Sequence, residues 1–183
     1  MFDYTKRNVR ERIERHVVSS FAERDEIVRS MAKGKKAELG CGEAAIFEDS
    51  DKVDVFPAKG CIVADLNKEM PLKGKYGTVI GLEIIEHLYN PDLFLENCFK
   101  ILESDGQLIL STPNVLYWRI RLALLFGSDR FFDTHGEHFY FFSPRSLTEL
   151  LEKHGFRDVR IIPIGKAKIK QFCGGFIAVA RKP

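Results

Sequence analysis

The sequence predicts an α/β fold with a mostly parallel, seven-stranded sheet and helices on both faces. Three observations lead to this prediction. Short apolar runs typical of strands alternate with segments of helical periodicity from residue 36 onward. The first apolar run ends in a glycine turn, Gly40-Cys41-Gly42. The length of 183 residues, with 45% hydrophobic and 30% charged residues, suits one globular domain over residues 1–183.

Residues 1–35 are expected to form a helical N-terminal lead. Val9, Ile13, Val17 and Phe21 recur every four residues, which indicates one apolar helix face. Arginines lie off this stripe. They form either a solvated helix face or a basic lid over an anionic substrate.

The remaining elements follow from apolar runs and from capping residues. A short helix is expected at 43–48. Asn90-Pro91 and Ser143-Pro144 each begin a longer helix, which Asp105-Gly106 and Gly155 respectively end. Strands are expected at 37–39, 52–55, 61–64, 78–82, 107–111, 156–164 and 172–180.

Residues 114–142 read as a late lid insertion. Leu116, Ile120, Ala123 and Leu124 make an apolar stripe within 114–126. This helix either covers the cleft, packs in a homodimer, closes over the substrate or contacts a membrane surface. The aromatic residues that follow either wall an apolar substrate pocket or bury the loop.

Composition restricts the class of protein. The net charge of +2 gives no strong global field, so nucleic acid is neither demanded nor excluded. The four cysteines are widely spaced, which suits a reducing cytoplasm and indicates neither zinc nor disulfides. No run approaches the ~20 apolar residues of a membrane span. The charged N-terminus does not fit a signal peptide.

The glycine turn carries the strongest chemical signal. Glu38 stands just before Gly40-Cys41-Gly42. A pyrophosphate cofactor would prefer bare amides there, whereas a carboxylate favours a cationic ligand. S-adenosylmethionine, with its ammonium and sulfonium groups, fits better than a dinucleotide.

Four motifs in order strengthen this interpretation: Glu38-Leu-Gly-Cys-Gly42, Ala64-Asp-Leu-Asn67, Gly81-Leu-Glu-Ile-Ile-Glu-His-Leu88 and Leu108-Ile-Leu-Ser-Thr-Pro-Asn114. Together they resemble class I S-adenosylmethionine-dependent methyltransferases, most closely the branch of the ubiquinone-pathway O-methyltransferases. The resemblance implies a Rossmann-like fold. It also implies that the following residues contact the cofactor: Glu38, Gly40, Cys41, Gly42, Glu83 and Ile84. Ala44 replaces a third glycine that is common in the family.

Two further acids are candidates for the nucleoside end of the cofactor. The resemblance implies that Asp65 meets adenine and that Leu66 packs on its ring. Asp54 would then accept the ribose hydroxyls, because a carboxylate can accept two hydrogen bonds at once. The alternative puts Asp65 on the ribose and leaves Asp54 as a surface carboxylate.

Glu83, Glu86 and His87 follow the fourth strand, and His135 and His138 come later. His87, Glu86 and His138 are the candidate catalytic residues. The Glu-His pair either anchors the loop, or His87 acts as general base, or the group binds a divalent cation. We expect no metal, although the pattern resembles the metal site of small-RNA 2′-O-methyltransferases.

The function expected is methyl transfer from S-adenosylmethionine to oxygen of a small hydroxylated, lipid-linked or sugar-linked acceptor. Base N-methylation is disfavoured, because no Asn/Asp-Pro-Pro-aromatic turn follows the fourth strand. The alternatives are metal-assisted ribose methylation of RNA and a catalytically silent binding protein. Nucleic acid is not an expected partner, and a homodimer through 114–126 is considered.

Overall fold

The computed structural model describes residues 21–128, 132, 138–165 and 169–183. Val9, Ile13, Val17 and His135 lie outside this part of the chain. The described part of the N-terminal lead forms a helix over residues 21–31.

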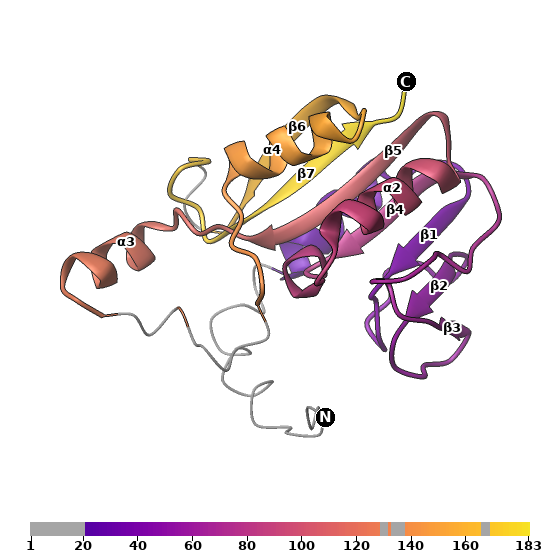
Figure 1. Cartoon of the computed structure of the whole chain (residues 1–183), viewed down its shortest axis with the longest axis horizontal. Helices are drawn as coiled ribbons and strands as arrows, with labels where there is room; N and C mark the ends of the chain where they lie inside the picture. The colour runs from indigo at the N-terminus through magenta and orange to yellow at the C-terminus, as the bar shows by residue number, and fades with distance from the viewer. Residues whose placement is uncertain (1–20, 129–131, 133–137, 166–168) are drawn as a thin grey trace.

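A seven-stranded sheet forms the centre of the molecule, in the order β3-β2-β1-β4-β5-β7-β6 (Figure 1). β1 and β4 pair in parallel, and the chain crosses from one half of the sheet to the other between these two strands. The strands are β1 (Lys36–Leu39), β2 (Asp51–Asp54), β3 (Cys61–Val63), β4 (Tyr76–Leu82), β5 (Leu102–Pro113), β6 (Arg157–Ile164) and β7 (Gly175–Arg181).

The expectation of a mostly parallel sheet is wrong, because the sheet is mixed. β1 to β5 pair in parallel, but β7 lies between β5 and β6 and is antiparallel to both. The reason is connection length. Only residues 165–174 separate β6 from β7, whereas a parallel crossover needs roughly a dozen residues and usually a helix.

Helices cover both faces of the sheet. α2 (Pro91–Ile101) and α4 (Pro144–Lys153) lie on one face, and the helix at 21–31 lies on the other (Figure 1). Both predicted caps are present: the side chain of Asn90 accepts from Leu93 N–H (3.1 Å), and that of Ser143 accepts from Ser146 N–H (3.1 Å). Each face is sealed by its own apolar cluster, so the sheet is buried on two sides.

Two local predictions are wrong. Residues 43–48 form turns and no helix, because Glu38 binds the backbone N–H groups of Ile46 and Phe47. β5 begins at Leu102 and runs through Asp105-Gly106, which was expected to end the preceding helix just before a strand at 107–111. Asp105 adopts φ 60, a conformation that its short polar side chain tolerates. The other strands are found with shifted ends.

α3 (Trp118–Leu125) stands away from the rest of the fold (Figure 1). None of its residues is buried. Among the residues that the structure describes, no helix has the length and the run of apolar residues needed to cross a bilayer.

Candidate active site

The candidate site lies at the carboxyl ends of β1, β2, β4 and β5. In an α/β sheet the crevice forms where neighbouring strands send the chain to opposite sides, which here is between β1 and β4. Gly40, Asp54, Glu83 and Asn114 all follow or end these strands. The structure therefore places these four residues along one edge of the sheet.

The glycine turn after β1 requires glycine. Gly40 and Gly42 adopt φ 70 and φ 52. A Cβ on Gly40 would lie 2.6 Å from Cγ1 of Ile84, so a larger residue there would force Ile84 to move. A Cβ on Gly42 would meet nothing closer than Asp54 Oδ2 at 4.0 Å. The turn thus packs tightly against Ile84 on one side and leaves its backbone accessible near Asp54.

Glu38 fixes the loop that follows the glycine turn. Its buried carboxylate accepts hydrogen bonds from Ile46 N–H (2.6 Å), Phe47 N–H (2.9 Å) and Ser50 Oγ (2.6 Å). These three hydrogen bonds give Glu38 a structural role, which is to hold the 46–50 loop in place. The negative charge remains beside the turn, and its predicted attraction for a cationic ligand stays a prediction.

Asp54 is joined directly to the glycine turn. Its Oδ2 accepts from Gly42 N–H (2.7 Å), and its Oδ1 accepts from Phe56 N–H (2.8 Å). The two residues after it, Val55 and Phe56, expose 56% and 49% of their surface. A nearly buried carboxylate is therefore flanked by an exposed apolar surface. The sequence analysis did not single out Val55 and Phe56, although two apolar residues directly after a candidate ribose acid were a readable signal.

Asp65 lies two residues beyond β3 on the same edge. Its Oδ1 accepts from the backbone and side-chain nitrogens of Asn67 (2.9 and 3.0 Å), and the backbone bond lowers its pKa. The side chain is 38% exposed. Leu66, expected on the adenine ring, is buried in the main apolar cluster. The assignment of Asp54 and Asp65 to ribose and adenine stays a prediction.

Glu83 occupies a strained position at the end of β4. It adopts φ 52, which is costly for a non-glycine residue and is most often found at functional sites. Its carboxylate accepts from Ser111 Oγ (2.6 Å). Burial raises the pKa of Glu83, and the Ser111 hydrogen bond opposes that rise.

Glu86 is the most unusual group of the site. Its side chain is buried, and neither carboxylate oxygen has a hydrogen-bond partner among the described residues. Burial, followed by the nearby Glu83 charge, raises the pKa of Glu86 to about 8. Thr112 opposes this shift, and its own hydroxyl oxygen is also buried without a hydrogen-bond partner in the described structure. A buried polar group without a partner indicates a place for water, an ion or a ligand.

Two histidines complete the cluster. The rings of His87 and His138 meet edge to face with centroids 4.7 Å apart, and His87 Nε2 lies 4.0 Å from Glu86 Oε1. One ligand atom from each of Glu86, His87 and His138 lies within 4.8 Å of the others. Glu83 is not part of that group. Burial and the neighbouring His87 lower the pKa of His138, so its imidazole is neutral near pH 7.

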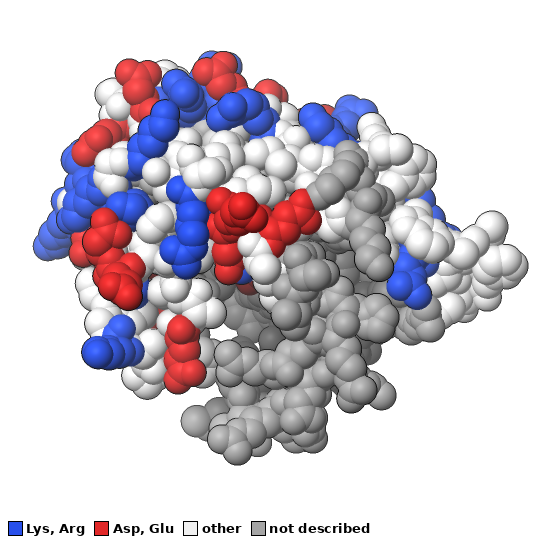
Figure 2. All heavy atoms as spheres, turned by 180° about the vertical axis from the view of Figure 1, so that it is seen from behind, with Lys and Arg blue, Asp and Glu red and all other residues white. Residues whose placement is uncertain are grey.

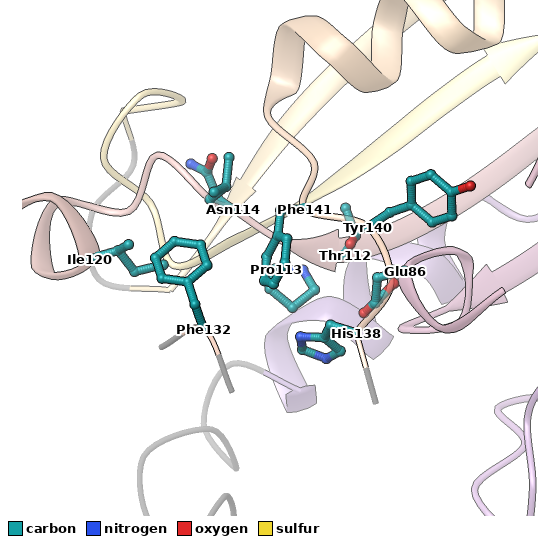
Figure 3. Close-up of a pocket in the computed structure, with 10 residues that line it drawn as sticks. Glu86, Thr112, Pro113, Asn114, Ile120, Phe132, His138, Tyr140 and Phe141 are labelled. Carbon is teal, nitrogen blue, oxygen red and sulfur yellow. The ribbon is translucent and has the colours of Figure 1, made fainter. Parts of the chain in front are cut away.

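A cavity of about 140 Å³ opens beside this cluster (Figure 3). Its wall is mostly apolar, and its titratable members are Glu86, His138 and Tyr140. The backbone oxygen of Glu86 accepts from the N–H groups of Phe139 and Tyr140 (2.8 and 3.2 Å), which holds the segment from His138 over the site. The lining residues are Glu86, Thr112, Pro113, Asn114, Val115, Ile120, Phe132, His138, Tyr140 and Phe141.

Arg24 is a charged group that the sequence analysis missed. It lies on the helix at 21–31, is almost fully buried, and favours the ionised forms of Glu83 and Glu86. Its guanidinium also binds Asp25 (2.7 Å). A signal was present, because Arg24 interrupts the stripe of Phe21, Val28 and Met31.

Comparison with known proteins decides the family. A model of the family described as "Methyltransferase domain" matches residues 17–161. The chain belongs to this family. It is 32% identical over 89 residues to a protein of Mycolicibacterium smegmatis named "Probable S-adenosylmethionine-dependent methyltransferase"; the match covers 48% of this chain and 32% of that protein.

The bovine mitochondrial ubiquinone biosynthesis O-methyltransferase is 29% identical over 83 residues, covering 44% of this chain and 22% of the enzyme. The matches therefore span less than a third of these two relatives. The crystal structure of a SAM-dependent methyltransferase from Thermotoga maritima superposes on this protein with a TM-score of 0.75 at 16% identity. The superposition covers 96% of this chain and 95% of the Thermotoga chain. That likeness shows a shared Rossmann-like methyltransferase fold.

Proposed function

We propose that this chain transfers a methyl group from S-adenosylmethionine to a hydroxyl oxygen of an acceptor bound in the apolar cavity. The observation that carries the proposal is the position of Glu86 and His138. They place one buried, unpartnered acid and one neutral imidazole in the wall of a mostly apolar cavity.

The residues present fit the cofactor. The backbone at Gly42 is open next to Asp54, whose carboxylate keeps lone pairs free for ribose hydroxyls. Val55 and Phe56 offer an apolar surface for a base. Arg24 is a cation suited to a ligand carboxylate, and Glu83 is suited to an ammonium. When bound, S-adenosylmethionine would supply an electrophilic methyl group on a positively charged sulfur.

The cavity fits the acceptor. Phe132, Phe141 and Ile120 provide apolar walls, so an acceptor with an apolar body and one hydroxyl would be held with little water. Glu86, protonated near neutral pH, would position the hydroxyl by a hydrogen bond. Segment 138–142 and α3 would act as the lid over this acceptor.

His138 would act as the proton acceptor. S-adenosylmethionine, when bound, would supply the methyl group, and the acceptor hydroxyl would lose its proton on methylation. His138 is neutral near pH 7 and can therefore take up this proton, and its ring lies against that of His87. Positioning and exclusion of water provide the rest of the rate increase.

Titration calorimetry and a radiolabelled-methyl assay test the proposal. S-adenosylhomocysteine should bind in the micromolar range, roughly −8 kcal/mol, and NAD should not. Label should enter lipid-extract or small-metabolite pools before total RNA. Label in RNA first would favour ribose methylation, and firm cofactor binding with label in no pool would favour a silent binder.

A matched pair of variants tests the proton acceptor. His138→Gln should lower the methylation rate by about 10²-fold with cofactor affinity kept. The control is His154→Gln. His154 does not line the cavity, and its Nε2 lies 2.8 Å from Asp92 Oδ1, so this variant should keep a rate close to that of the parent. Equal rates for both variants would remove His138 from the mechanism.

A metal-assisted reaction is a second candidate, favoured by the donor set. One carboxylate and two imidazoles that converge within 4.8 Å suit a divalent transition metal, and both Glu86 oxygens lack partners in the described structure. A metal there would hold the acceptor oxygen and favour its deprotonated form. Loss of activity with a chelator, restored by a divalent metal, would establish this route. The proton-transfer route predicts activity that survives chelation.

A further inference from the structure

α3 exposes an unusual amount of apolar surface. None of its eight residues is buried, and Leu125 and the following Phe126 are each 78% exposed. Trp118 and Leu122 are 46% and 45% exposed. Large exposed apolar patches on a globular protein generally mark a binding surface.

The residues of α3 are distributed in an ordered way. Trp118, Leu122 and Leu125 are spaced i, i+4 and i+7, which puts them on one face of the helix. Arg119 and Arg121 flank this face on its two sides. Ile120 lies on the opposite side and lines the cavity of the candidate site. The outward face is therefore an apolar stripe with an arginine along each edge.

A second segment extends this surface. Ile169 and Phe172 are 59% and 41% exposed, and the Arg121 guanidinium lies 5.3 Å from the centre of the Phe172 ring. Asn114 fixes the segment beside α3 by donating from Nδ2 to the backbone oxygens of Lys170 and Cys173 (both 3.0 Å). We call the combined region the α3 surface: Trp118, Arg119, Arg121, Leu122, Leu125, Phe126, Ile169, Lys170 and Phe172.

The charge of the α3 surface is of one sign. Arg119, Arg121 and Lys170 are cationic, and residues 115–128 and 169–174 contain no Asp or Glu. Figure 2 shows the lobe at its right edge, where α3 lies, in blue and white without red. The occupant should therefore be both apolar and anionic.

We propose that the α3 surface inserts into the interface of a bilayer that contains anionic phospholipids. Trp118 has the amphipathic ring favoured at headgroup depth, and Leu122, Leu125 and Phe126 would enter the acyl region. Arg119 and Arg121 have stems long enough to keep their guanidinium groups among the phosphates while these residues are immersed.

Charge argues against a second copy as the occupant. In a two-fold dimer the same patch meets itself, which would bring Arg119 and Arg121 of both copies close together. The described α3 surface has no carboxylate to offset them. An anionic bilayer supplies that compensation across its whole area.

Membrane contact would also serve the adjacent cavity. Ile120 lines the cavity on the same helix that carries the outward stripe, so an acceptor with a lipid tail could enter from the bilayer. This consequence rests on the proposed function, whereas bilayer binding does not. Failure to bind vesicles would leave cofactor binding and methyl transfer untouched.

Flotation of the full chain with vesicles tests the proposal. Vesicles with about 30% phosphatidylglycerol in phosphatidylcholine should bind the protein about tenfold more tightly than phosphatidylcholine alone. Leu122→Asp/Leu125→Asp should fold like the parent, and its affinity for the anionic vesicles should be lower by about tenfold or more. Trp118 fluorescence should shift to the blue on binding, because Trp118 is the chain's single tryptophan.

A matched pair of charge variants tests the role of the arginines. Arg119→Glu/Arg121→Glu should lose the preference for anionic vesicles. Arg157→Glu/Arg160→Glu makes the same charge change at exposed positions of the edge strand β6 and should bind like the parent. If both double variants lose the preference for anionic vesicles equally, the preference depends only on net charge, and the assignment to α3 is overturned.

Two other results would also overturn the proposal. One is the absence of binding to either vesicle. The other is a concentration-dependent dimer in ultracentrifugation that Leu122→Asp/Leu125→Asp abolishes, because the stripe would then be covered by a second copy.

Discussion

Relative to the parent, Glu86→Gln should gain stability as the pH rises. Burial raises the pKa of Glu86 from its ordinary 4.5 to about 8, so over this interval the folded state keeps a proton that the unfolded state has released. When the folded state binds more protons, stability falls as pH rises. Glu86→Gln cannot release a proton and is free of this loss.

The magnitude follows from the width of the interval. Each pH unit between the two pKa values costs 1.36 kcal/mol, so moving from about pH 5 to about pH 7 should cost the parent about 2–3 kcal/mol that the variant keeps. Any constant difference from the new amide cancels, because only the change with pH is compared.

The change of this stability difference with pH can be measured by urea unfolding of both proteins at several pH values in the presence of a chelator. Chelation removes any cation that would hold Glu86 ionised. Glu96→Gln is the matched control, because Glu96 is exposed on α2, and it should track the parent at every pH. If the stability difference between Glu86→Gln and the parent stays flat across this range, Glu86 is not a buried neutral acid, and its proposed role as a hydrogen-bond donor fails.

Three further predictions concern the same site. Gly40→Ala should cost about 1–3 kcal/mol more stability than Gly60→Ala, since both residues have positive φ but only at Gly40 would a Cβ meet Ile84; equal thermal unfolding of the two variants would contradict the close packing. Asp54→Ala should weaken S-adenosylhomocysteine binding by about 1.5–3 kcal/mol in calorimetry, and unchanged affinity would move the ribose contact to Asp65. Asn114→Ala should lower the free energy of unfolding by about 1–3 kcal/mol in urea, because it leaves the buried carbonyl of Cys173 without its donor, and an unchanged free energy would refute that role.

The sequence predicted the elements whose determinants are local. α2 and α4 begin where Asn90 and Ser143 provide caps, and the glycine turn follows β1. These features depend on residues within a few positions of one another, so an isolated sequence is enough to recognise them. The grouping of Glu86 and His87 followed in the same way from their separation of one residue.

The rest of the fold and site depends on contacts between distant residues. The 43–48 region contains helix-forming residues, yet Glu38 binds its backbone N–H groups and holds them in turns. The antiparallel placement of β7 reflects a connection that is too short for a crossover. The pKa of Glu86 and the burial of Arg24 arise from packing between elements far apart in the chain, and no local pattern reports such packing.

The close packing at Gly40 and Ile84 should couple the evolution of these two positions. The side chain of Ile84, the residue just after Glu83, occupies the space that a Cβ on Gly40 would need. A change at either position is therefore constrained by the other. Related chains that carry a smaller residue at position 84 should tolerate alanine at position 40. Those that keep a branched residue at position 84 should keep glycine, so these two positions should vary together in an alignment of relatives.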